Sequence, residues 1–143
     1  MTQPQNPAGY SGTPLRKKLG IKTGQLVAFP NAPKDFAATL GELPEGVRLT
    51  SGGETGLDLV VFFVSSSAEL RDGFKRWSGA LKPAGMLWIA WPKKTSGVRT
   101  DLTENVVREV ALVNGLVDVK VAAIDATWSG LKLVYRLKDR PPK

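Results

Sequence analysis

The chain of 143 residues contains no cysteine and no histidine. Without cysteine there is no disulfide, no thiolate zinc site and no cysteine nucleophile. Without histidine the chain lacks the commonest metal ligand and the commonest general base near neutral pH. These absences exclude serine–histidine hydrolysis, histidine-based zinc sites and histidine phosphorelay within this chain, and we expect no metal site.

Long apolar segments are also absent. No run reaches the ~20 apolar residues that a membrane-spanning helix needs. The opening segment, MTQPQNPAGYSG, has no positively charged start followed by an apolar core, so we do not expect it to be a secretory signal. We therefore expect a cytoplasmic protein with no membrane partner.

The residues that are present have a globular balance: 42% are hydrophobic and 23% are charged. The length predicts one domain, which we place at residues 13–138, between a flexible tail at 1–12 and a polar tail at 139–143. Twenty basic residues against 13 acidic ones give a formal charge of +7. Because this charge is not in one block, it favours a soluble basic surface over a dedicated polyanion site, and any nucleic-acid binding is expected to be weak.

The first predicted helix begins near Thr13, a suitable N-cap. Leu15 and Leu19 share one face of this helix, and Gly20 is a natural C-terminal stop. The apolar residues 26–29 then predict the first buried strand.

A second short helix is predicted after this strand. Asn31 is a suitable N-cap for it, and Phe36 and Leu40 have helical spacing. Residues 47–50 predict a short strand.

Two apolar runs predict the central strands. Residues 57–64, LDLVVFFV, show no alternation, which indicates burial on both faces. The run that begins at Met86, MLWIAWP, has the same character, and we assign Trp88 and Trp91 to the core.

Two longer helices follow these strands. One of the serines at 65–67 should cap the first helix, and Asp101 and Glu104 have capping-box spacing for the second. The predicted apolar faces are Leu70, Phe74, Trp77 and Leu81 in the first helix, and Val106, Val107, Val110 and Val113 in the second.

The C-terminal part alternates apolar and polar residues at 117–123 and again at 131–137, which predicts an antiparallel hairpin. We place its turn at 127–130, with Trp128 exposed or half exposed. Together the elements predict a three-layer, Rossmann-like α/β fold with a mostly parallel sheet of about six strands.

This pattern resembles the C-terminal half of Rossmann-like class I methyltransferases. The resemblance covers residues 57–137 and includes the LKPAG turn at 81–85, where that family commonly has Leu-Lys-Pro-Gly-Gly. It implies a methyltransferase-like topology. The loop at 30–33 has none of the family's cofactor-binding glycines, and Thr50-Ser51-Gly52 replaces the expected acidic residue. We therefore expect no cofactor, S-adenosylmethionine included.

Nearly the whole chain is also similar to the DUF3052 family of small bacterial proteins. The motifs are GYSGTPL at 9–15, KKLGIK at 17–22, NAP at 31–33 and WPKK at 91–94. This resemblance implies a bacterial origin and no particular activity.

A candidate site follows from the topology. With strand order 2-1-3-4-6-5, the loops after the first, third and fourth strands would meet beside the switch point, where such sheets bind ligands. Helix N-termini and lysines there would favour an anion, although the serines and Asn31 could equally be caps and the lysines merely solvated. The candidate ligand contacts are Asn31, Ser65, Ser66, Lys93, Lys94 and Thr95, with Tyr10 and Ser11 as a lid.

Three functions remain open. We favour a non-catalytic binding or regulatory module on a degenerate methyltransferase-like scaffold, with an anionic small molecule or a protein as partner. The first alternative is a protein that binds an anionic ligand or nucleotide at the strand-end loops, with or without catalysis. The second is a weak nucleic-acid binder that uses the basic surface.

Overall fold

The centre of the structure is a pair of long parallel strands, β3 (Leu57–Phe63) and β4 (Leu81–Pro92). In β3 every residue except Asp58 is buried, and β4 is buried from Leu87 to its end. Strands buried on both faces need a layer of helices above and below. The computed structural model describes residues 13–136, so the predicted tails and the candidate lid at Tyr10 and Ser11 lie outside the described residues.

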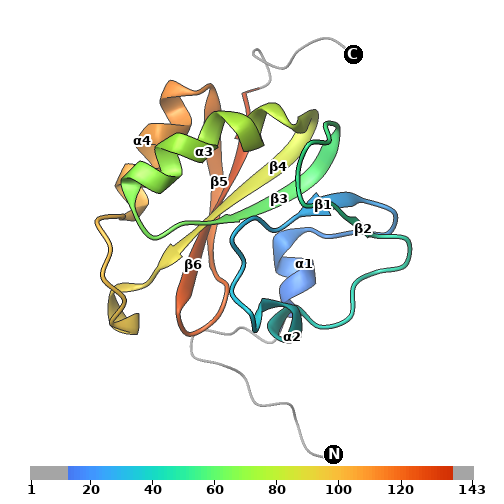
Figure 1. Ribbon diagram of the computed structural model, residues 1–143, viewed down its shortest axis with the longest axis horizontal. Helices are drawn as coiled ribbons and strands as arrows, with labels where there is room; N and C mark the ends of the chain where they lie inside the picture. Colours follow the sequence, from blue (N-terminus) through green and yellow to red (C-terminus); the bar gives the residue numbers. More distant parts are fainter. Residues whose placement is uncertain (1–12, 137–143) are drawn as a thin grey trace, which may run out of the picture.

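Together with the remaining strands, β3 and β4 form a mixed six-stranded sheet with helices on both faces (Figure 1). The sheet order is β2-β1-β3-β4-β6-β5. Between residues 13 and 136 the other elements are, in chain order, α1 (Leu15–Leu19), β1 (Leu26–Ala28), α2 (Phe36–Leu40), β2 (Arg48–Leu49), α3 (Ser67–Gly79), a 3₁₀ turn (Lys94–Ser96), α4 (Glu104–Val113), β5 (Leu116–Ala123) and β6 (Trp128–Tyr135).

The strand directions confirm the predicted fold class and strand order. β2, β1, β3 and β4 are mutually parallel, whereas β6 runs antiparallel to both β4 and β5. From β1 the chain builds outward to β2 on one side and to β3 on the other. The topological switch point therefore lies between β1 and β3, as the sequence predicts.

Two separate hydrophobic cores lie on the two faces of the sheet. Leu70, Phe74 and Trp77 of α3 pack on one face together with buried valines of α4. Gly73 permits this close approach, since a Cβ atom there would lie 2.5 Å from Cζ of Phe62. The other face is covered by the short helices α1 and α2, which Figure 1 shows grouped near β1.

Both tryptophans of β4 belong to the cores, as predicted, and they lie on opposite faces. Trp91 packs in the α3 and α4 core, and Trp88 packs in the α1 and α2 core. The indole N–H of Trp88 donates a 2.9 Å hydrogen bond to the carbonyl oxygen of Leu19, the last residue of α1. This bond satisfies a helix-end carbonyl and attaches α1 to the centre of the sheet.

Two element boundaries in the C-terminal half of the chain differ from the prediction: the start of β4 and the position of the hairpin turn. β4 begins at Leu81 rather than Met86, because Leu81 pairs with Leu57 across an irregular register. The hairpin turn precedes Trp128, which is the first residue of β6 and is half-buried. The carboxylate of Asp125 accepts the backbone N–H groups of Thr127 and Trp128, and this local bonding places the turn earlier.

Helix capping also differs from the prediction. The N-cap of α1 is Pro14 rather than Thr13, with no side-chain hydrogen bond. Ser66 caps α3, as one of the three serines was expected to do. Val113, predicted for the apolar face of α4, is the last residue of the helix and is 83% exposed. Among the described residues, no helix has the length and apolar character to cross a membrane.

Replacing Trp88 by Phe should destabilise the protein more than the same change at Trp91. The first change leaves the buried Leu19 carbonyl without its donor, at a cost of about 1–3 kcal/mol beyond the lost packing. Trp91 makes no such bond, so Trp91→Phe is the matched control. Urea unfolding measures both free energies, and equal losses would contradict the role of the indole hydrogen bond.

Candidate functional site

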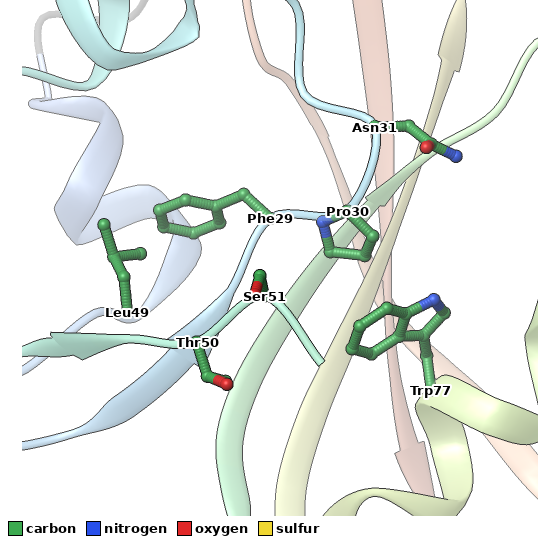
Figure 2. A pocket seen from close by; sticks show the side chains of 7 residues that line it. All are labelled: Phe29, Pro30, Asn31, Leu49, Thr50, Ser51 and Trp77. Atoms are coloured by element: carbon green, nitrogen blue, oxygen red, sulfur yellow. The ribbon is translucent and has the colours of Figure 1, made fainter. Parts of the chain in front are cut away.

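A pocket of about 530 Å³ lies where β1 and β2 end beside α3. Figure 2 shows Phe29 and Leu49 on one side of it and Trp77 on the other, with Pro30 between them. Beyond the carboxyl ends of parallel strands is where sheets of this class bind ligands. The lining residues are Phe29, Pro30, Asn31, Leu49, Thr50, Ser51 and Trp77.

Asn31 forms the tight turn that bounds this pocket. Its φ angle is 62°, and it is the only non-glycine residue with positive φ in the described part of the chain. Its side-chain amide donates to the carbonyl oxygen of Phe63 at 3.3 Å, and the Phe63 N–H donates to the carbonyl oxygen of Pro30 at 3.1 Å. Asparagine tolerates this left-handed conformation better than other side chains do. The turn after β1 is therefore made without glycine.

The prediction that Asn31 caps a helix is wrong. The N-cap of α2 is Asp35, and the segment between them forms turns. The sequence signal was ambiguous, because asparagine is favoured both at N-caps and in left-handed turns.

The wall formed by the end of β2 has an apolar and a polar part. Leu49 is 60% exposed, and it lies beside the half-buried Phe29 (Figure 2). The N–H of Thr50 donates to the Val27 carbonyl oxygen at 2.9 Å, which holds this segment against β1. The hydroxyl groups of Thr50 and Ser51 follow directly. This wall thus offers apolar area on which a flat ring of a ligand can pack, and hydroxyl groups that can form hydrogen bonds with polar groups of a ligand.

The opposite wall is α3. Trp77 lines the pocket, and the guanidinium carbon of Arg76 lies 4.7 Å from the centre of its ring. A second hollow of about 440 Å³ shares Pro30, Asn31, Ser51 and Trp77 with the first and adds charged side chains of α3. The two hollows form one groove with an apolar half and a charged half. The charged residues are Glu69, Asp72 and Arg76.

The predicted lysines lie in a different pocket. Lys93, Lys94 and Thr95 line a hollow of about 530 Å³ whose other wall is the start of α4. This pocket does not include Asn31. The loop after β4 turns toward α4, so the single site expected from the sequence is divided between two places.

The two predicted serines belong to neither pocket. The hydroxyl of Ser66 accepts the Glu69 N–H at 3.1 Å, and the carboxylate of Glu69 accepts the Ser65 N–H at 2.7 Å. The carbonyl oxygen of Ser65 accepts the hydroxyl of Thr100. These groups serve the start of α3, which is the alternative that the sequence left open.

Asp101 has a structural function that the sequence did not predict. Its carboxylate accepts the backbone N–H of Ser67 at 2.8 Å and the hydroxyl of Ser67 at 2.7 Å. The predicted capping box is wrong, because Thr103 caps α4 by accepting the Val106 N–H. Asp101 instead attaches the loop before α4 to the start of α3, and the hydrogen bonds from Ser67 lower the pKa of its carboxyl group.

The chain resembles known proteins in its fold and not in its sequence. No protein-family model matches it, and no curated protein matches it in sequence, so the resemblance to the DUF3052 family stays a prediction. Solved structures do match. The type 11 methyltransferase structure from Sulfolobus solfataricus superposes with a TM-score of 0.63 at 14% identity, over 90% of this chain and 93% of that one. This is the class I methyltransferase fold.

Two further matches extend this finding. Fibrillarin from Aeropyrum pernix, solved with natively bound S-adenosyl-L-methionine, has a TM-score of 0.56 at 14% identity, over 81% of this chain and 69% of that one. TrmN from Thermus thermophilus has a TM-score of 0.56 at 11% identity, over 86% of this chain. The chain spans about half of TrmN, 47% of its length.

The expectation that the chain takes no cofactor, S-adenosylmethionine included, is corrected by these matches, since the fold is shared with a protein that holds this molecule. The groove also fits such a group. It lies at the strand ends beside the switch point, has about 530 Å³ in its apolar half, and is bounded by the left-handed turn at Asn31. The carboxylate expected after β2 is replaced by the hydroxyl groups of Thr50 and Ser51, which retain hydrogen-bonding capacity.

The stability of the protein should fall in acid partly through Asp101. Its folded pKa is lowered, so the stabilisation that it contributes is complete above its ordinary pKa of 3.8 and is lost as the pH falls through the folded value. Ser67→Ala removes one of the bonds that lower the pKa. Thermal unfolding between pH 5 and pH 2 should show a smaller decline for Ser67→Ala than for the unchanged protein, and identical slopes would contradict this role.

Proposed function

We propose that this protein binds S-adenosylmethionine, or the nucleoside product that remains after loss of its methyl group, in the groove between the ends of β1 and β2 and helix α3. The observation that carries the proposal is the left-handed turn at Asn31, directly after β1, which borders a pocket of about 530 Å³. Positive φ makes a tight turn at the end of the strand, a conformation for which glycine is the usual residue.

The two halves of the groove suit the two ends of this ligand. Phe29 and Leu49 would cover the adenine ring, and the exposure of Leu49 leaves apolar area free for it. The hydroxyl groups of Thr50 and Ser51 would bond the ribose hydroxyl groups. The amino-acid end would lie toward α3, where Asp72 can pair with its ammonium group and Arg76 with its carboxylate.

Bound S-adenosylmethionine would supply an electrophilic methyl group. The seven residues that line the main pocket include none that titrates near neutral pH. A group that removes a proton from a methyl acceptor must lie within hydrogen-bond reach of that acceptor. The lining therefore favours, as the narrower form of the proposal, a binding or regulatory module that takes up the ligand without transferring its methyl group.

Removing the two hydroxyl groups after β2 should weaken binding. Thr50→Val with Ser51→Ala removes two hydrogen bonds of about 0.5–1.5 kcal/mol each, which predicts an affinity weaker by about five- to 150-fold. Isothermal titration calorimetry with S-adenosylmethionine and S-adenosylhomocysteine measures it. The control is Thr95→Val, which lies in the separate pocket next to α4. Absence of heat with both ligands would overturn the proposal.

The turn at Asn31 provides a second comparison. Asn31→Gly keeps access to positive φ and should retain binding, whereas Asn31→Val disfavours that conformation and should lose it. Circular dichroism of both variants checks that the fold is intact. Equal affinities would show that the turn does not determine the site, and single-turnover assays with labelled methyl donor would separate binding from transfer.

A further inference from the structure

The molecule has a second surface whose chemistry the groove does not explain. It consists of five lysines from three parts of the chain, which we call the lysine face: Lys18, Lys22, Lys93, Lys120 and Lys132. Lys120 of β5 lies directly opposite Lys132 of β6 in the strand register. The amine of Lys18 in α1 donates to the carbonyl oxygen of Ala123 at 3.1 Å, so α1 reaches the end of β5 through this side chain.

Lys120 and Lys132 lie on the side of β6 and β5 that points away from α3 and α4. Lys93 follows the end of β4, where it also lines the pocket next to α4 and lies close enough to Lys18 for its charge to lower the pKa of Lys18. Leu131 and Leu133 of β6 belong to the core under those helices, so the alternating residues Lys132 and Val134 point to the other side. On that side α1 packs over β4, through the bond between Trp88 and Leu19. Lys120 is exposed, and Lys132 and Val134 are half-buried.

Like charges directly opposite one another destabilise a strand pair. The pKa of Lys132 is lowered by burial and then by the charges of Lys120 and Lys22, and the pKa of Lys18 is lowered by burial and then by Lys120 and Lys93. No carboxylate is among these causes.

The ion pairs found within residues 13–136 join Lys82 to Asp58, and Arg108 to Glu104 and Asp118. Lys22, Lys93, Lys120 and Lys132 take part in none of them. In the described part of the protein, several positively charged side chains therefore lie near one another on the lysine face.

A half-buried tryptophan borders this face. Trp128 is the first residue of β6 and points to the same side as Lys132. The indole makes a T-shaped contact with the ring of Phe63, at 5.1 Å between ring centres. Trp128 is also the register partner of Pro92, which places it next to Lys93. An aromatic ring among lysines is the arrangement with which proteins hold single strands, because every base can stack and every phosphate is an anion.

We propose that the lysine face binds single-stranded nucleic acid, with Lys22, Lys93, Lys120 and Lys132 contacting phosphates and Trp128 stacking with a base. The longer helices α3 and α4 lie on the opposite side of the sheet, so no helix of this face is suited to enter the major groove of a duplex. Lysine is depleted at protein–protein interfaces, which argues against an acidic protein as the partner.

The proposal is tested by fluorescence anisotropy with labelled 20-nucleotide oligo(U) RNA and oligo(dT) DNA across a salt series. Lys120→Gln with Lys132→Gln should weaken binding and reduce the slope of log K against log salt by about 1.4, since each lost phosphate contact contributes about 0.7. The control is Arg71→Gln with Lys75→Gln. These substitutions remove the same amount of positive charge from two exposed residues of α3, on the opposite face of the sheet.

Trp128→Leu should weaken binding without changing the salt slope, which a purely electrostatic surface would not show. Circular dichroism checks the fold of each variant. The proposal is overturned by equal losses in the α3 control, by absence of binding at low salt, or by tighter lysine-dependent binding of polyglutamate or anionic vesicles than of either oligonucleotide. Similar affinity for RNA and DNA supports it, and retention of binding by the groove variants shows that the two surfaces are separate.

Discussion

The parallel pairing of β3 with β4 is the constraint on which the other elements depend. Both strands carry long runs of apolar side chains that point to both faces, so each face requires its own cover. The α3 and α4 layer covers one face with large side chains. The other face has two helices of five residues each, too short to be stable by themselves, and they depend on tertiary contacts. The bond from Trp88 to Leu19 is one of these contacts.

The same constraint explains which parts of the sheet the helices leave uncovered. The helices cover the centre of the sheet better than its margins, and both proposed surfaces lie toward the margins. At one side, the short strands β1 and β2 end beside α3 and leave the groove. At the other, β5 and β6 leave the lysine face on the side away from α4. A ligand site and a polyanion site can therefore coexist without sharing residues.

The groove also shows that a left-handed turn after the first strand can be made without glycine. The sequence comparison with methyltransferases depends on glycines that this chain does not have after its first strand. The backbone there still adopts positive φ, at an asparagine whose side chain is bonded to β3. The absence of glycine from this loop therefore does not exclude a tight turn there, and the structural matches corrected the cofactor expectation.

Most of the fold could be predicted from the sequence. Continuous apolar runs such as LDLVVFFV identify strands buried on both faces, and alternation at residues 117–123 identifies the antiparallel hairpin. These signals are local, so the strand order followed from them and from general rules of chain connection. The candidate site was predicted only in part. Asn31 borders the groove, but Leu49 and Trp77 were not recognised as part of it, and Trp77 was assigned to the core that it also serves.

The sequence by itself therefore determined which segments form strands and helices, and that the fold is methyltransferase-like. It also determined which chemistries are absent, because cysteine and histidine are absent whatever the fold. The tertiary structure decided which polar groups form hydrogen bonds at helix ends, as at Ser65 and Ser66, and which polar groups line a pocket instead. It also decided that Lys120 lies opposite Lys132. Such pairings depend on strand register and on packing between distant segments, which no local pattern of residues contains.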